Sequence, residues 1–263
     1  MIDMSGLYTH ADYPAALNRF NTSNNRKKWS KFKDVHLSVT NHKCPICECS
    51  LRVDELLSRP SGRVVEEDEN TDAEAESKHT IGSTVDHYRP QTFYDFLALT
   101  PKNYILMCSE CNNIYKGCEF PLFGTSPVRA QILAEVTNEL PLIVNPINDN
   151  LLDLFQLVVR RDSSGRKVLE LSPKHTQGYL YEKALTTIKL FCLGDCELNA
   201  HSNPNVKKLR ISLLHSHFVK FDAFIDAYID KNIPKMRAEI ADKNLKDYGF
   251  FKFILKNQFK NLM

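Results

Sequence analysis

Apolar residues recur with the period of a helix in several parts of the chain. Between residues 206 and 230 they return every three or four positions, which is typical of one buried helix face, and Pro234 should end that helix. A Ser-Pro pair opens a second helix predicted for 172–191, because serine caps helices and proline suits their first turn. We also expect helices in residues 1–43 and in the amphipathic stretch 250–259.

Shorter apolar runs bounded by turn residues predict strands. One short strand begins after Ile81 and is stopped by Pro90. A second, apolar strand covers 103–108, and a helix should start just after it. Two further runs flank a turn signature at 162–165 and predict a β-hairpin. Helices combined with antiparallel strands indicate an α+β fold.

The composition is that of an ordinary globular protein. The 263 residues are 43% hydrophobic and 25% charged, which suffices for one or two cores and excludes collagen-like, mucin-like and wholly disordered chains. The net charge of +2 is uninformative, but seven Lys and Arg oppose three Asp in residues 1–43, and eight oppose three acids in 231–263. We expect these basic ends to hold substrate or a partner; the alternative is that their lysines merely solvate helix faces.

An acidic segment interrupts the first half of the chain. Residues 66–76 contain seven acids and no base, with almost nothing apolar to bury. We therefore expect residues 60–80 to form a disordered insertion. It would be dispensable for the chemistry, or would mask a basic surface until a partner complex is triggered.

The chain carries no sequence signal for a membrane or for export. No apolar run approaches the ~18 residues of a membrane span, and the first ten residues lack the basic and apolar parts of a signal peptide. A cytoplasmic location without membrane contact is the expectation. In that reducing compartment, paired cysteines indicate metal binding before they indicate disulfides.

Four of the eight cysteines form two CxxC pairs, Cys44 with Cys47 and Cys108 with Cys111. Four thiolates so spaced can close a tetrahedral zinc site, which would staple together two distant pieces of chain. Buried free thiols are the alternative, and His36 or His42 could replace one cysteine ligand. We expect one structural zinc ion at the two pairs and assign no chemical role to the other cysteines.

Polar residues lie between and just after the two pairs in a recognisable order: Asp86, His87, Asn103, Asn112 and Lys116. The order resembles the HNH endonuclease motif, in which CxxC, DH and an Asn before a strand are followed by CxxC with His or Asn, and a downstream Lys. The resemblance covers residues 44–117, and the acidic insertion departs from it. It implies a zinc-stabilised ββα-metal core at 44–125 within a mostly helical protein, after a basic helical segment at 1–43 and before a β-hairpin and mainly helical region at 126–263.

The same residues suit phosphodiester hydrolysis on chemical grounds. A neutral imidazole can take a proton from water near pH 7, so His87 is the expected general base. The Asp86 carboxylate and the Asn112 amide oxygen are hard ligands for a catalytic Mg²⁺ or another divalent ion. Neighbouring strand residues point to opposite faces, so either a turn or bulge after Val85 aims Asp86 and His87 together, or Asp86 reaches the metal from the other side.

Three more residues complete the predicted site. By analogy with the motif, Asn103 would tie the loop that presents His87, a structural role compatible with local backbone capping. Arg89 and Lys116 are the candidate substrate-binding residues, because guanidinium and ammonium groups contact phosphate oxygens. For Arg89, a solvated loop arginine is the alternative.

A narrower resemblance over about residues 40–150 is carried by DHYRP, CNNIYKGCEFPL and LIVNPINDN. These segments are similar to the PtuB-type HNH nucleases of Septu and retron anti-phage defence. The resemblance implies an effector nuclease with a PtuA-type ABC ATPase as partner and, in a retron setting, a reverse transcriptase with its RNA–DNA product. DNA is the default substrate and an RNA such as tRNA the alternative. The rivals are a zinc-knuckle module that binds nucleic acid or a partner without cutting, and an HNH nuclease of the restriction or homing type.

Overall fold

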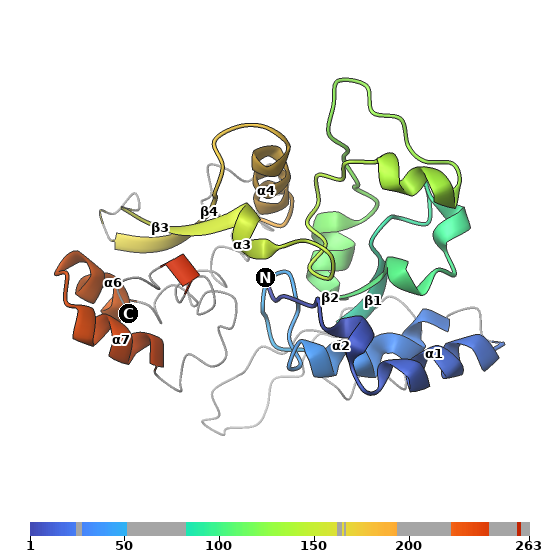
Figure 1. Cartoon of the computed structure of the whole chain (residues 1–263), viewed down its shortest axis with the longest axis horizontal. Helices are drawn as coiled ribbons and strands as arrows, with labels where there is room; N and C mark the ends of the chain where they lie inside the picture. The colour runs from blue at the N-terminus through green and yellow to red at the C-terminus, as the bar shows by residue number, and fades with distance from the viewer. Residues whose placement is uncertain are drawn as a thin grey trace, which may run out of the picture.

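The computed structural model describes residues 1–24, 28–51, 83–161, 165, 167–193, 222–241 and 257–258. Helices and two small antiparallel sheets make up this part of the chain, so the predicted α+β class is confirmed (Figure 1). The acidic insertion predicted at 60–80 lies outside the described residues. So do most of the helical stretches predicted at 206–230 and 250–259.

Short helical elements form the N-terminal part, as predicted: η1 (Leu7–Thr9), α1 (Tyr13–Thr22), η2 (Lys28–Phe32) and α2 (Lys33–Val39). They are held together by a small aromatic core, because the rings of Phe20, Phe32 and Tyr104 lie with their centroids 5.4–5.9 Å apart. Tyr104 belongs to the following sheet. The aromatic core therefore fixes the basic N-terminal helices against that sheet.

The first sheet consists of β1 (Ser83–His87) and β2 (Tyr104–Cys108), which pair antiparallel from Ser83 opposite Cys108 to His87 opposite Tyr104. Both strands lie where the sequence predicts them. The connection between them contains η4 (Asp95–Leu97) and η5 (Pro101–Asn103). Every residue of β2 is buried, so this strand forms the centre of the core.

The predicted helix after β2 is present as η6 (Glu110–Lys116), which has π-helical rather than α-helical hydrogen bonding. The Gly117 amide donates to the Asn112 carbonyl at 2.7 Å and closes the last turn. Gly117 has a positive φ of 47°, a conformation that glycine adopts without strain. Short π-helical turns of this kind frequently occur at functional sites.

The second sheet is the predicted hairpin, β3 (Phe155–Arg161) paired with β4 (Lys167–Pro173); it follows η7 (Leu133–Asn138) and α3 (Leu151–Leu154). The next helix, α4 (Tyr179–Leu190), is the one predicted for 172–191: its end is confirmed, but its predicted start at residue 172 is wrong. Ser172 and Pro173 remain in β4, where Pro173 pairs with Phe155 at the end of the sheet. Strand pairing outweighs the local Ser-Pro preference here, because a proline at a strand end costs few ladder bonds.

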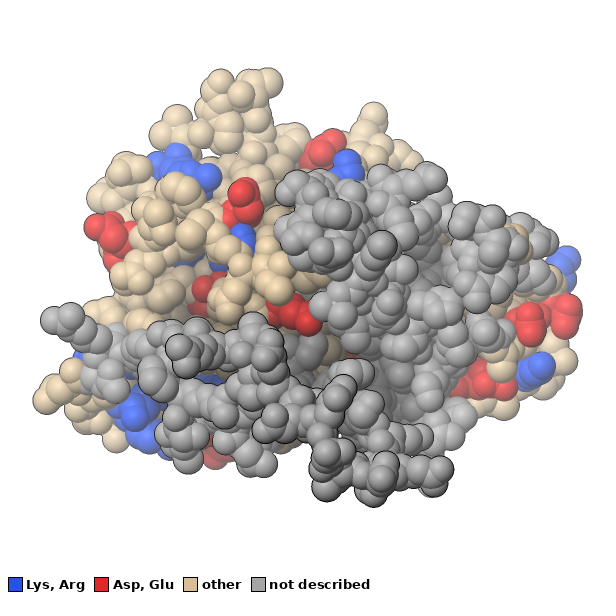
Figure 2. Space-filling model, turned by 180° about the vertical axis from the view of Figure 1, so that it is seen from behind, with Lys and Arg blue, Asp and Glu red and all other residues tan. Residues whose placement is uncertain are grey.

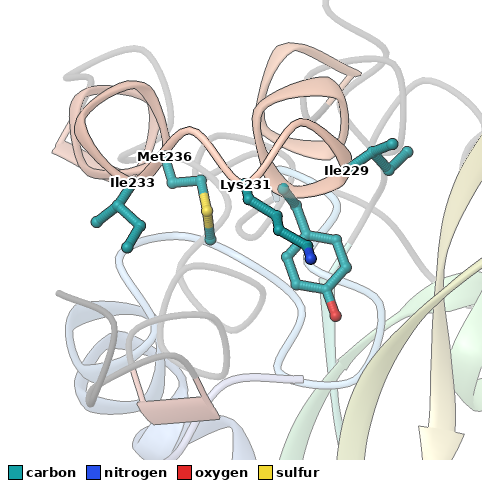
Figure 3. Close-up of a pocket in the computed structure, with 5 residues that line it drawn as sticks. Ile229, Lys231, Ile233 and Met236 are labelled. Carbon is teal, nitrogen blue, oxygen red and sulfur yellow. The ribbon is translucent and has the colours of Figure 1, made fainter.

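Two helices, α6 (Asp222–Ile229) and α7 (Ile233–Ala241), form a hairpin in the C-terminal part. The first helix ends at Ile229, before Pro234, and a turn with Lys231 at a positive φ of 53° separates the two helices. Pro234 lies in the first turn of α7, a helix that the sequence analysis missed, so the prediction that Pro234 ends the preceding helix is wrong. Apolar side chains, with Tyr228 and Lys231, line a cavity of about 480 Å³ between the two helices (Figure 3). This hairpin lies across the molecule from β1 and β2 (Figure 1).

One continuous hydrophobic core runs through the described chain, from the N-terminal residues through β2 and α4 to α6 and α7. It includes Leu106 of β2, Ile188 of α4 and Phe224 of α6, all of them almost fully buried. A second cluster, which includes the aromatic core of Phe20, Phe32 and Tyr104, holds most of the buried apolar residues of the N-terminal helices. Among the described residues, no helix combines the length and the apolar character needed to cross a bilayer.

His36 on α2 connects the N-terminal helices to β2 by a buried hydrogen bond. Its Nδ1 accepts from the Leu106 amide at 3.1 Å, and burial lowers the pKa of His36 to about 3. His36 has its ordinary pKa of about 6.5 in the unfolded chain. Between pH 6.5 and pH 3 the unfolded state therefore binds a proton at His36 that the folded state does not. The free energy of unfolding should therefore decrease as the pH falls from about 6.5 towards 3, by up to about 5 kcal/mol.

Urea unfolding between about pH 7 and pH 5 tests this expectation. In the wild type the slope should approach about 1.4 kcal/mol per pH unit from His36 alone, and His36→Gln should remove that part. His175→Gln changes an exposed histidine and should keep the wild-type slope. Equal slopes in the wild type and in His36→Gln would contradict the assignment.

Candidate functional site

The two CxxC pairs meet in one buried cluster. The sulfur atoms of Cys44, Cys47, Cys108 and Cys111 all lie within 4.8 Å of one another. The Cys47 and Cys108 sulfurs are 3.7 Å apart. Four sulfurs bonded to one tetrahedral zinc at about 2.3 Å are spaced about 3.8 Å apart, so the donor set fits a structural zinc ion.

Neighbouring backbone groups prepare the cluster to carry thiolates. The Cys108 amide donates to the Cys44 sulfur at 3.4 Å, and the Cys111 amide donates to the Cys108 sulfur at 3.3 Å. Hydrogen bonds from the Cys108 and Cys111 thiols hold the pKa of the Cys47 thiol well below its usual value, whereas contacts with the Cys44 and Cys47 sulfurs raise the pKa of the Cys108 thiol. Thiolate is the form that binds a metal, so all four sulfurs would ionise together only when a cation offsets their charge. Among the described residues, neither His36 nor His42 belongs to the set of possible ligands.

The cluster fixes the element that carries the next predicted site residue. Cys108 ends β2, and Cys111 lies in η6 directly before Asn112. Asn112 faces Thr84 and Asp86 on β1, two residues that share one side of the strand. The cysteine cluster therefore determines where Asn112 meets Asp86.

The Asn112 amide satisfies its surroundings in one orientation. With its nitrogen towards Asp86, it donates to Oδ2 at 3.1 Å and to Oδ1 at 3.2 Å, while its oxygen accepts from the Thr84 hydroxyl. In the reverse orientation its nitrogen lies 2.8 Å from Thr84 Oγ1. The amide oxygen would then face the carboxylate, acceptor against acceptor, so the first orientation holds unless a cation lies between the two groups.

The spacing of these oxygens suits a hard divalent cation. Neighbouring ligands on an octahedral magnesium ion, with bonds of 2.0–2.1 Å, are about 2.9 Å apart. If a bound cation turned the Asn112 amide oxygen towards Asp86, that oxygen would lie 3.1–3.2 Å from the carboxylate oxygens, close to this spacing. Asp86 is part-buried, with its side chain 16% exposed. The pair can thus offer two protein oxygens and leave the remaining positions to water or phosphate.

His87 lies at the end of β1 in a fixed orientation. Its Nε2 lies 2.9 Å from the Ala98 carbonyl oxygen, which can only accept, so Nε2 carries the proton and Nδ1 the lone pair. The rings of Trp29 and Tyr104 pack edge-on against the imidazole at centroid distances of 5.3 and 5.4 Å. His87 is therefore held in the tautomer that a base acting through Nδ1 needs.

The strand register decides how Asp86 and His87 point. Asp86 pairs with Ile105 and His87 with Tyr104, in regular register and without an inserted residue. Asp86 accordingly contacts η6, whereas the His87 ring contacts η2 and Tyr104. The sequence left two arrangements open. The described strand has no bulge, so the second arrangement is present, in which Asp86 lies on the other side of the strand from His87.

Asn103 ties down the backbone that follows His87. Its Oδ1 accepts from the Arg89 amide at 2.8 Å, and its Nδ2 donates to the Arg89 carbonyl at 3.0 Å. The Asn103 carbonyl also accepts from the Tyr88 amide at 2.7 Å. The side chain of Asn103 is buried and thus acts on the loop rather than on a ligand.

Arg89 and Lys116 have protein partners of their own. Arg89 donates to Glu139 Oε2 at 2.8 Å and packs over the rings of Tyr88, Tyr94 and Phe120. Its side chain is 14% exposed, so it is not the solvated loop arginine considered as the alternative. Lys116 donates to Asp86 Oδ2 at 2.7 Å from a fully buried position. Contact with substrate phosphate remains a prediction for Arg89 and Lys116. Their protein partners hold both side chains away from the open surface.

The sequence analysis missed three contributors to the site. Trp29 is the single tryptophan and lies in the basic N-terminal segment without a motif around it, and the Ala98 carbonyl carries no sequence signal at all. Thr84 was also overlooked, although it precedes Asp86 by two residues and therefore shares its face of the strand. That alternation could have identified it.

The charges visible on one face of the molecule do not form a single basic surface. In Figure 2, the described Lys and Arg side chains are interspersed with Asp and Glu side chains. The cavity between α6 and α7 lacks a set of groups for catalysis, since four of its five lining residues are apolar or aromatic and only Lys231 is charged. The catalytic candidates are instead gathered at β1, β2 and η6.

Comparisons with known proteins add no assignment: no family model, no curated protein and no solved structure matches this chain.

Proposed function

We propose that this protein is a divalent-metal-dependent endonuclease of the HNH type, with a zinc-stabilised ββα core formed by β1, β2 and η6. The observation that carries the proposal is the end of β1. There an imidazole in a fixed tautomer directly follows a carboxylate that accepts from the Asn112 side-chain amide. These are the groups that phosphodiester hydrolysis requires, and a module that only binds nucleic acid has no use for them.

In this proposal His87 is the general base. The Ala98 carbonyl retains the proton on Nε2, which leaves Nδ1 free to take a proton from the attacking water. Trp29 and Tyr104 prevent the ring from rotating away. Asn103 supports the base indirectly, because it fixes the backbone of the loop that follows it.

Asp86 and Asn112 would hold the catalytic divalent ion, and Cys44, Cys47, Cys108 and Cys111 the structural zinc ion. When bound, Mg²⁺ or a similar ion supplies positive charge to the leaving oxygen. The opposite directions of Asp86 and His87 suit this chemistry, because in-line displacement has the attacking and leaving oxygens on opposite sides of phosphorus. A substrate that crosses the end of β1 would meet His87 on one side and the Asp86–Asn112 pair on the other.

The biological setting is proposed from the sequence resemblance alone. On that basis the protein is an effector of anti-phage defence, with a PtuA-type ABC ATPase as partner and, in a retron setting, a reverse transcriptase with its RNA–DNA product. The reaction handles a phosphate and does not distinguish sugars or bases, so DNA is the default substrate and RNA such as tRNA the alternative.

A cleavage assay with purified protein tests the proposal. Supercoiled plasmid, single-stranded DNA and tRNA are incubated with Mg²⁺ or Mn²⁺, and then with EDTA. We expect cleavage of at least one of these substrates, its loss with EDTA, and its recovery when Mg²⁺ is added back. Asp86→Asn should reduce the rate by at least ~10²-fold, because it removes the charged ligand.

The matched control is Asp153→Asn, which changes an exposed carboxylate on α3 and should leave the rate within about twofold of the wild type. Binding of these substrates without cleavage in either metal would instead favour the zinc-knuckle binding module. Cleavage that is equal in Asp86→Asn and in the wild type would remove Asp86 from the site.

A further inference from the structure

Lys116 is a charged residue that lies inside the protein. Its side chain is fully buried, although it comes from the end of the short turn η6. An ammonium group that has left water must be paired and hydrogen-bonded, or it destabilises the fold. The partners of Lys116 therefore determine what this residue can do.

All three N–H donors of Lys116 have acceptors. Its Nζ lies 2.7 Å from Asp86 Oδ2, 3.0 Å from the His87 carbonyl oxygen and 3.4 Å from the Gly117 carbonyl oxygen. An ammonium group has three donors and no acceptor, so this arrangement leaves none for a substrate phosphate. Lys116 instead joins the end of η6 to the two residues that carry the proposed chemistry.

The contact with Asp86 fixes one of its two carboxylate oxygens. Oδ2 is held by the ammonium group and also lies 3.1 Å from the Asn112 amide nitrogen, whereas Oδ1 has only that amide, at 3.2 Å, among the described groups. A divalent ion bound at Oδ1 with a bond of about 2.1 Å would lie roughly 5–6 Å from the Lys116 nitrogen. At this separation a single and a double positive charge repel one another appreciably, even where solvent screens them in part.

We propose that Lys116 is a positioning residue that sets how Asp86 meets the catalytic cation. It holds Oδ2, so that the carboxylate offers the cation one oxygen, and its charge keeps the cation weakly bound and exchangeable. The inference rests on the proposed function, because it concerns the same cation site. It assigns Lys116 to the metal side of the reaction and not to substrate phosphate.

Two substitutions separate the charge of Lys116 from its hydrogen bonds. Lys116→Met removes both, whereas Lys116→Gln removes the charge and keeps an N–H donor near Asp86. Mn²⁺ binding is measured by the electron paramagnetic resonance signal of the free ion, and cleavage rates are measured at saturating Mn²⁺. The control is Lys102→Gln, which changes an exposed lysine on η5.

Both Lys116 variants should bind Mn²⁺ at least about tenfold more tightly than the wild type, because the repulsion is gone. Lys116→Met should nevertheless cleave at least about tenfold more slowly, with unchanged substrate affinity, because Asp86 is no longer held. Lys116→Gln should lose less of the rate. Lys102→Gln should behave as the wild type in both measurements.

Other results would overturn the inference. Unchanged or weaker Mn²⁺ binding in Lys116→Gln would exclude the effect of charge. Weaker substrate binding with a shallower salt dependence would identify a phosphate contact. Loss of zinc content and fold in both variants would show that Lys116 serves the fold alone. If the wild type binds Mn²⁺ but cleaves nothing, the proposed function fails, while the Mn²⁺ titrations still decide the role of Lys116.

Discussion

Replacing Cys108 by serine should remove zinc from the protein and unfold the region around β1, β2 and η6. Cys108 is fully buried, its sulfur lies 3.7 Å from that of Cys47, and it accepts a hydrogen bond from the Cys111 amide. Structural zinc sites contribute an apparent ~10–16 kcal/mol of binding free energy, more than most domains have in net stability. A two-stranded sheet is marginal by itself, so the region would otherwise depend on the packing of β2 in the hydrophobic core.

Elemental analysis and thermal unfolding of protein purified without added metal check this prediction. The wild type should contain about one zinc ion per chain, and Cys108→Ser close to none, with a large loss of the cooperative transition. Cys118→Ser is the matched control, since Cys118 is exposed and lies outside the four-sulfur cluster. A wild type that is folded and free of zinc would favour buried free thiols and remove the metal from the account.

Replacing His87 by glutamine should nearly abolish cleavage while the protein still folds and binds nucleic acid. Glutamine can donate to the Ala98 carbonyl in place of Nε2, but it has no basic nitrogen to take a proton from water. General base catalysis commonly increases a rate by ~10²–10⁴-fold, so the cleavage rate should decrease by a factor of that size or larger. Zinc content and substrate affinity should remain those of the wild type.

The exposed His175 offers the control substitution, His175→Gln, which should cleave at the wild-type rate. Cleavage and binding are measured on the same preparations, the former by product formation and the latter by fluorescence anisotropy with a labelled oligonucleotide and EDTA present. If His87→Gln retains the rate within about tenfold, His87 is not the base. Another group would then have to activate water.

Local sequence patterns were sufficient for the elements that carry the site. The strand that ends before Pro90 and the apolar strand before Cys108 lie where alternation and turn residues predicted them. The spacing of the cysteines predicted the four-sulfur cluster, because two CxxC turns each present two sulfurs to one point. Both inferences use neighbouring residues, whose geometry the backbone fixes over a few positions.

Local patterns failed where a residue chooses between competing partners. Ser172 and Pro173 favour a helix start in isolation, but pairing with β3 keeps them in β4, and α4 begins at Tyr179. Pro234 was expected to end a helix, but that helix ends at Ile229 in a turn at Lys231, and Pro234 lies in the first turn of the next helix. Local propensity is worth less than the tertiary contacts that decide between such alternatives.

Sequence by itself thus determined the residue types available for chemistry and the strands that hold them: Asp86 beside His87, Asn112 beside Cys111, and the four cysteines. Tertiary structure decided what the charged groups contact. Arg89 pairs with Glu139, Lys116 is buried against Asp86, and His87 is oriented by the Ala98 carbonyl. These contacts join residues 11 to 50 positions apart in the chain. Packing of the whole core sets such distances, whereas periodicity describes only the direction in which a side chain leaves its own strand or helix.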